Sequence, residues 1–310
     1  MDGVLKGFVL LIAIIGAGYL AARIGVVKES NRKVLNDVAF YITSPPLLFT
    51  MVASSELSVL LSPVILIIAV SAAIVAIAYI VLSRLFFRRD LATVTLGAMS
   101  TSYVNSTNLG LPIALYILGD AAYVAPLLLV QQLIYSPIIL SALETSRGSS
   151  GQGARGAAGA VLRALRNPII GACILGFGFA LWDVPIPELV LGPLEMLGGA
   201  SVPLILISFG ASLRGQRILQ QGSDWSGIFV ATGLKMFAMP LIAWALAVAM
   251  GLGPTETFAA VIFASLPTAN VAFNFAMIYG RAQTLVRDTV LITTCLSIPI
   301  TAVIAWFLAR

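Results

Sequence analysis

The chain has 310 residues, of which 59% are hydrophobic and 10% charged, and its formal net charge is +5. Its mean hydropathy is +1.02. Soluble globular domains have about 50% apolar residues, so this composition excludes an ordinary soluble domain and indicates a membrane protein.

Apolar segments of about 20 residues, the length of a transmembrane helix, recur along the whole chain. The alternating segments of about 10 residues that are typical of membrane β-barrels are not seen. We therefore predict an all-α polytopic membrane protein with ten transmembrane helices. The predicted spans are 4–26, 33–54, 60–83, 91–118, 121–143, 166–184, 190–213, 227–251, 255–280 and 285–308.

The positive charges are distributed unevenly over the connections between these spans. Nearly all Lys and Arg residues lie in or beside odd-numbered connections, such as Arg84 and Arg88 at the third and Arg214 at the seventh. The positive-inside rule then places the odd connections in the cytoplasm and both termini outside. The net charge thus indicates topology in a cell membrane (inner or plasma membrane) and not a surface for nucleic acid.

A segment rich in Gly, Ala and Ser divides the chain after the fifth span. We predict a first repeat at 1–147, a flexible cytoplasmic linker at 148–165 and a second repeat at 166–310. Because each half has five spans, the second half enters the membrane from the opposite side, as in an inverted repeat. Ser44-Pro45-Pro46 and Ser201-Val202-Pro203 are similar motifs in the second and seventh spans.

Polar and helix-breaking residues interrupt the fourth and ninth spans. The fourth contains STSYVNSTN at 100–108, followed by Gly110 and Pro112, and the ninth contains SLPTANVAFNF at 265–275. Polar residues in membrane helices also serve packing and kinks. However, proline removes a backbone donor, and a broken helix is tolerated in a bilayer only beside protein or water. Two broken helices at corresponding places predict a transport site at the membrane midplane.

These motifs resemble those of a known family. Asn105-Ser-Thr-Asn-Leu-Gly110-Leu-Pro112 resembles the N-x-x-x-x-G-x-P motif in the fourth span of the auxin efflux carrier family, which includes plant PIN transporters and bacterial carriers. The segment 267–280 resembles the ninth span of that family, and Gln131 with Tyr135-Ser136 resembles the fifth. The resemblance covers essentially the whole chain.

The resemblance implies a scaffold made of spans 1, 2, 6 and 7 and a mobile transport domain made of spans 3–5 and 8–10. Broken helices 4 and 9 would cross within the transport domain. Plant members have a second proline at the ninth-span crossover, where this chain has Ala272. Proline therefore cannot make 271–273 non-helical here.

We predict a secondary transporter that moves a small organic anion, such as an auxin-like or malonate-like carboxylate, by alternating access. Helix N-termini and amide side chains are suitable donors for a carboxylate. The predicted substrate-binding residues are Ser44, Asn105, Asn108, Gly110, Pro112, Gln131, Tyr135, Asn270, Val271 and Asn274.

Two alternatives stay open. One is a sodium-coupled symporter that resembles the bile acid family, with Asn105, Ser106, Thr107 and Asn270 as oxygen ligands; the other is a membrane receptor that does not transport. No enzyme activity, cofactor or other metal is predicted, because the chain has no histidine and no arrangement of catalytic residues. The expected partners are the substrate and the bilayer, with a homodimer possible.

Three charged residues lie within predicted spans. Lys235 is expected either to snorkel to the inner surface or to attract anions in the inward-facing cavity. Asp37 and Glu195 are candidate proton carriers, although both lie close to a membrane face.

Overall fold

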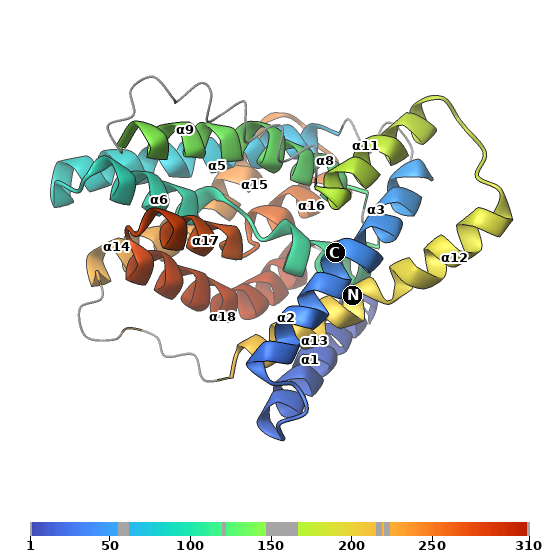
Figure 1. Ribbon diagram of the computed structural model, residues 1–310. Coiled ribbons are helices and arrows are strands. Elements are labelled where there is room, and N and C mark those ends of the chain that lie inside the picture. Colours follow the sequence, from blue (N-terminus) through green and yellow to red (C-terminus); the bar gives the residue numbers. More distant parts are fainter. Residues whose placement is uncertain are drawn as a thin grey trace. The chain divides into compact units, whose positions relative to one another are not determined.

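The computed structural model describes residues 2–54, 62–119, 122–146, 167–214, 219 and 224–308 (Figure 1). Within these ranges the regular structure is helical, apart from one isolated β-bridge between Val104 and Thr268. The predicted all-α class is therefore confirmed. The predicted linker at 148–165 lies outside the described residues.

The chain divides into two compact units, which we describe separately. Unit 1 comprises residues 1–62, 107–129 and 162–216. Its helices are α1 (Asp2–Arg23), α2 (Glu29–Val38), π-helical η1 (Ala39–Thr43), α3 (Ser44–Ala53), α7 (Leu111–Ile113), π-helical η4 (Ala114–Leu118), α8 (Val124–Leu129), α11 (Pro168–Leu181), α12 (Glu188–Gly199) and α13 (Ser201–Ser212).

Unit 2 comprises residues 63–106, 130–161 and 217–310. Its helices are α5 (Pro63–Leu82), π-helical η2 (Ser83–Phe87), α6 (Leu91–Ser102), π-helical η5 (Val130–Tyr135), α9 (Ser136–Ser146), α14 (Trp225–Gly233), π-helical η6 (Leu234–Ala238), α15 (Met239–Ala249), α16 (Pro254–Ala264), α17 (Asn270–Tyr279) and α18 (Gln283–Leu308). The π-helical turn η3 (Ser106–Gly110) begins at the last residue of this unit's first segment.

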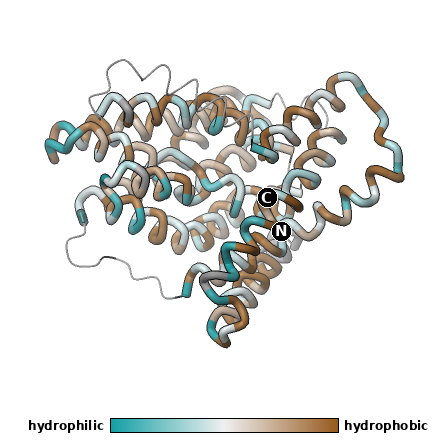
Figure 2. The backbone as a smooth tube through the Cα atoms, viewed as in Figure 1, coloured by the Kyte–Doolittle hydropathy of each residue, from teal (hydrophilic) through white to brown (hydrophobic). Residues whose placement is uncertain are grey.

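Five of the described helical stretches are long and apolar enough to cross a membrane. They are Pro63–Phe87, Val124–Leu143, Glu188–Ser212, Trp225–Ala249 and Gln283–Leu308. Apolar residues lie along most of these helices (Figure 2), and some of the largest are exposed, such as Leu66 and Ile77 on α5. Exposed apolar side chains on membrane-length helices are suited to contact with lipid.

Glycines allow close helix packing in unit 1. α1 packs along α13 (Figure 1), and at their contact a Cβ atom at Gly210 would overlap the carbonyl oxygen of Ile15. α11 packs along α3, where a Cβ atom at Gly176 would lie 2.9 Å from the carbonyl oxygen of Phe49. Small residues at such contacts let two backbones approach closely, which drives helix association in membranes.

The similar serine-proline motifs meet where α3 crosses the α12–α13 helix pair. The hydroxyl oxygens of Ser44 and Ser201 form a 2.8 Å hydrogen bond, and both residues are buried. Nearby, the Ser208 hydroxyl donates to the Asn36 side-chain oxygen over 2.6 Å. Residues at corresponding motif positions in the two halves are thus direct neighbours.

The breaks predicted in the fourth and ninth spans are present and lie within the polar segments 100–108 and 265–275, but Pro112 is not where the first of them falls. The fourth span is interrupted at 103–105, whereas Pro112 lies inside the helical run 106–118 that follows. In the ninth span the interruption is at 265–269, and 271–273 is helical because α17 begins at Asn270. Pro112 is therefore not the point of interruption.

Candidate functional site

The two interruptions meet in unit 2 as a short antiparallel pair, which we call the crossover bridge (103–105 and 267–269). The backbone N–H of Asn105 donates to the carbonyl oxygen of Pro267, and that of Ala269 donates to the carbonyl oxygen of Tyr103, each over 2.9 Å. Val104 and Thr268 lie opposite each other and are buried. A break in a membrane helix leaves backbone N–H and C=O groups without hydrogen-bond partners. The pairing of the two segments supplies these partners.

Hydroxyl groups fix the second strand of the crossover bridge. The Thr268 hydroxyl donates to the carbonyl oxygen of Ser100 over 2.6 Å, at the end of α6. The Thr268 backbone N–H donates to the Thr293 hydroxyl over 3.1 Å, on α18. Thr268 therefore joins the bridge to both α6 and α18.

Gln131, in η5, contacts the first strand through both ends of its amide. Its nitrogen donates to the carbonyl oxygen of Val104 over 2.9 Å, and its oxygen accepts from the Ser106 hydroxyl over 2.6 Å. The side chain is buried. It thus spans the point where the extended segment ends and the next helical turn begins.

Two tyrosine–serine pairs join the same strand to η5 and α9. The Tyr103 and Tyr135 rings stack with centroids 5.5 Å apart and planes 24° apart. The Tyr103 hydroxyl forms a 3.0 Å hydrogen bond with Ser136, and the Tyr135 hydroxyl forms a hydrogen bond with Ser102. The contact is reciprocal, because each tyrosine bonds the serine beside the other.

Lys235 belongs to η6, and its side chain contacts the last residue of α16. α16 is the helix that directly precedes the second segment of the crossover bridge. The Lys235 side-chain nitrogen is 3.3 Å from the carbonyl oxygen of Ala264, the last residue of α16, and 3.0 Å from the Met239 sulfur. The residue is fully buried, so it does not extend to the surface as a snorkelling lysine does. Donors are favourable at this place, because the last carbonyls of a helix lack intrahelical partners and carry negative partial charge.

The structure brings together some of the predicted site residues. Asn105, Ser106, Gln131 and Tyr135 lie on or against the crossover bridge, and Asn105 is 4% exposed. α17 begins at Asn270, directly after the bridge, and both Asn270 and Asn274 are exposed. Val271 packs against the hydrophobic cluster that contains Tyr103.

Other predicted site residues belong to unit 1. They are Ser44, Thr107, Asn108, Gly110 and Pro112. The Ser44 hydroxyl forms a hydrogen bond with Ser201 inside unit 1. In this structure Ser44 therefore joins α3 to α13. The two candidate proton carriers, Asp37 on α2 and Glu195 on α12, are exposed in the same unit.

Sequence reasoning did not single out Ser102, Tyr103, Ser136 and Thr268 as functional residues. The order Ser-Tyr at 102–103 and its reverse, Tyr-Ser, at 135–136 was an available signal. Asp288 was also missed: it is fully buried on α18, accepts from the Leu219 backbone N–H over 3.2 Å, and pairs with Arg287 at 2.8 Å.

Membrane-length apolar helices, together with two broken helices joined at a buried bridge, define a polytopic membrane transporter. The chain belongs to the family described as membrane transport protein, whose model matches residues 4–153 and 157–305. This match, together with relatives that are named auxin efflux carriers, confirms the resemblance to auxin efflux carriers, and the family consists of transporters and not of enzymes.

Relatives agree with this assignment. The chain is 26% identical to an uncharacterised transporter of Methanocaldococcus jannaschii, over 99% of this chain and 98% of the relative. It is 27% identical to a putative malonate transporter of Rhizobium meliloti, over 95% and 92% of the two chains. An auxin efflux carrier component of Oryza sativa is 28% identical over 44% of this chain and 23% of the plant protein.

Proposed function

We propose that this protein is a secondary transporter of small organic anions that carry a carboxylate, and that it works by alternating access. The observation that carries the proposal is the crossover bridge, where the two broken helices pair through two backbone hydrogen bonds. Discontinuous helices of this kind form the substrate sites of many secondary transporters.

The chemistry near the bridge suits an anion. One helical run begins at Ser106 and the other at Asn270, each within two residues of the bridge. Helix N-termini present backbone N–H groups and roughly half a positive charge, which favours a carboxylate without a full cation. The amides of Asn105 and Asn270 add side-chain donors beside these termini.

The names of the relatives point to the same substrate class. One relative is named as a putative malonate transporter and others as auxin efflux carriers. Malonate is a dicarboxylate and auxin is a carboxylic acid, so a carboxylate is their shared chemical group. We extend this class to the present chain as part of the proposal.

We further propose ten spans arranged as two inverted repeats, 1–147 and 166–310, with a scaffold of spans 1, 2, 6 and 7 and a transport domain of spans 3–5 and 8–10. The Ser44–Ser201 contact and the reciprocal bonds of the bridge support the repeat, because a two-fold relation brings equivalent residues together. Unit 1 contains the four proposed scaffold spans, and unit 2 contains most of the proposed transport domain. The exception is 107–129, which belongs to unit 1.

The sodium-coupled alternative is less well supported. In transporters with broken helices, the C-terminal ends of half-helices and unwound carbonyls hold the coupling cation. Here the Lys235 nitrogen lies against the final carbonyl of α16, so a side-chain donor is already at one such end. We therefore propose transport that does not require sodium.

Uptake of radiolabelled malonate and of indole-3-acetate into proteoliposomes, with and without sodium, tests the proposal. We expect uptake of one of these anions, with counterflow when the vesicles are preloaded, and no loss when choline replaces sodium. A receptor that does not transport would bind the ligand without counterflow.

Asn105→Ala tests the place of binding. A hydrogen bond to a charged ligand contributes about 1.5–3 kcal/mol, so we expect roughly 10- to 150-fold weaker substrate binding. Asn105→Asp should weaken it further, because its carboxylate would repel an anion. Asn31→Ala is the matched control, since it removes the same side chain from an exposed position on α2. Unchanged or tighter binding by Asn105→Asp would exclude an organic anion at this place.

A further inference from the structure

A groove opens in unit 1 beside the crossing of α3 and α12. Near the crossing the helices are in close contact, since a Cβ atom at Gly198 would lie 2.9 Å from the Leu47 Cα atom. Beyond this point they diverge and leave a cavity of about 360 Å³. Its lining includes Thr50 on α3 and Ser54 directly after it, Ile186 before α12, and Leu191 and Glu195 on α12.

The polar groups of this groove, which we call the α3–α12 groove, act as hydrogen-bond acceptors. The Thr50 hydroxyl donates to the carbonyl oxygens of Pro46 and Leu47, each over 3.0 Å, and the Ser54 hydroxyl donates to that of Thr50 over 2.6 Å. With both protons bonded to α3 itself, the hydroxyls offer lone pairs to a ligand. Among the described residues that line the groove, Glu195 is the only charged one.

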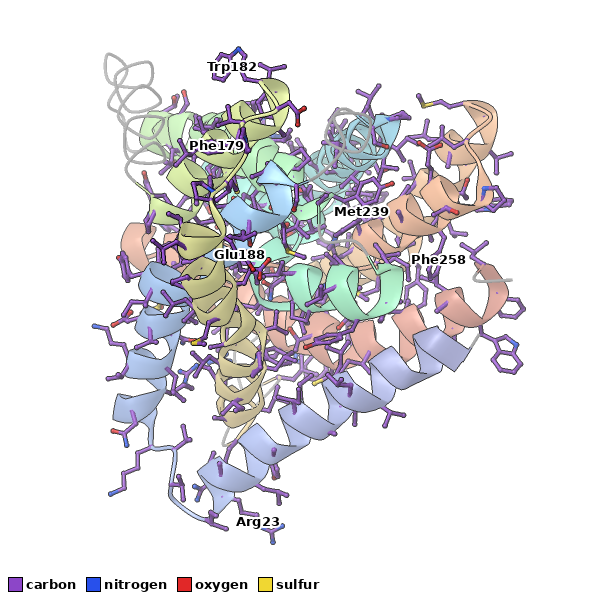
Figure 3. The ribbon with its side chains drawn as sticks, turned by 90° about the vertical axis from the view of Figure 1, so that its right-hand side faces the viewer. Arg23, Phe179, Trp182, Glu188, Met239 and Phe258 are labelled. Atoms are coloured by element: carbon purple, nitrogen blue, oxygen red, sulfur yellow. The ribbon has the colours of Figure 1, made fainter. Side chains whose placement is uncertain are left out.

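Glu195 lies on a helix surface that is otherwise suited to lipid. On α12, Leu189 is 89% exposed and Met196 is 82% exposed. Beyond the end of α11, Trp182 is 75% exposed and points away from the helices (Figure 3). The stretch 188–212 is long and apolar enough to cross a membrane, and Glu195 is its eighth residue. A carboxylate on such a surface is unfavourable without a cationic partner.

We propose that the α3–α12 groove binds the primary ammonium headgroup of a phospholipid. The ammonium group has three N–H donors and a positive charge, which match one carboxylate and two hydroxyl acceptors. The apolar walls formed by Ile186 and Leu191 suit the upper part of the acyl chains. Charge complementarity therefore selects a phospholipid with a primary amine as the occupant.

Phosphatidylethanolamine and phosphatidylcholine share the phosphate and differ in the nitrogen, which has N–H donors only in the first. Lipid retention by the purified protein, measured by native mass spectrometry after incubation with each lipid, isolates the role of the ammonium donors. We expect at least one phosphatidylethanolamine to be retained about tenfold more strongly than phosphatidylcholine, as one charge-assisted hydrogen bond implies. Equal retention of both lipids would overturn the proposal.

Glu195→Gln keeps the shape of the side chain and removes its charge, so we expect it to abolish this preference. Glu188→Gln is the matched control, because Glu188 is an exposed glutamate at the start of the same helix and does not line the groove (Figure 3). Glu188→Gln should keep the preference for phosphatidylethanolamine. Loss of this preference in both variants would overturn the assignment of the site.

Free ethanolamine tests whether the occupant is a lipid. We expect it not to displace the retained phosphatidylethanolamine at equal concentration, because it lacks the acyl chains. Full displacement would assign the groove to a soluble amine and overturn the lipid assignment. If Glu195→Gln does not fold, Thr50→Val provides a second variant, which should weaken the preference by removing one acceptor.

Discussion

At the scale of single residues, the paired tyrosines and serines next to the crossover bridge are the most specific feature of unit 2. Tyr103 and Tyr135 each bond the serine that neighbours the other ring. These side chains are buried or, for Tyr135, partly buried. Their two hydrogen bonds hold the elements in a single register, because a shift along either one breaks both bonds. We infer that η5 and the bridge behave as one rigid body.

A double-mutant cycle with Ser102→Ala and Tyr135→Phe measures this pairing. Each single change should lower the free energy of unfolding by about 0.5–1.5 kcal/mol, since each removes one partner of a hydrogen bond. The double variant should lose less than the sum of the two, with a coupling of at least about 0.5 kcal/mol, in chemical denaturation of the purified protein.

Tyr41→Phe is the control for this cycle. Tyr41 is 62% exposed, so loss of its hydroxyl should leave the free energy of unfolding nearly unchanged. Strictly additive effects of the Ser102 and Tyr135 changes would show that the two hydroxyls do not interact.

At the scale of helices, two glycines of α1 and α13 occupy different environments. A Cβ atom at Gly210 would overlap the Ile15 carbonyl oxygen, whereas one at Gly16 would meet nothing within 4 Å. Gly210→Ala should therefore separate α1 from α13 and destabilise the protein by about 1–3 kcal/mol, as overpacking does. Thermal unfolding in detergent measures this effect.

Gly16→Ala is the matched control on α1. It adds the same methyl group where space is available, and alanine is the better helix former, so the unfolding temperature should stay the same or rise. Equal losses at Gly16 and Gly210 would show that the effect is not due to packing between α1 and α13.

At the scale of the whole molecule, we propose that both termini lie outside the cell and the odd connections inside. In a variant without Cys173 and Cys295, we expect Pro185→Cys, in the connection between α11 and α12, to react with an impermeant maleimide in intact cells. Val26→Cys, in the connection between α1 and α2, should react only after permeabilisation. Both positions are exposed, so a difference reports sidedness. The reverse pattern would invert the proposed topology.

The sequence by itself determined the class of protein, the family and the approximate positions of the breaks. These follow from local properties: apolar segments of membrane length, and polar residues with Gly or Pro in the middle of two of them. The family resemblance was also local, because it depended on short motifs such as the one from Asn105 to Pro112.

Only the tertiary structure decided where the helices stop and what holds them there. A helix in a membrane stops where another segment can satisfy its free backbone groups. Asn105 and Tyr103 find these partners in Pro267 and Ala269, so the fourth span breaks there, and Pro112 stays within a helix. The burial of Lys235 against the end of α16 has the same cause: carbonyls that lack intrahelical partners accept from a donor supplied by another helix.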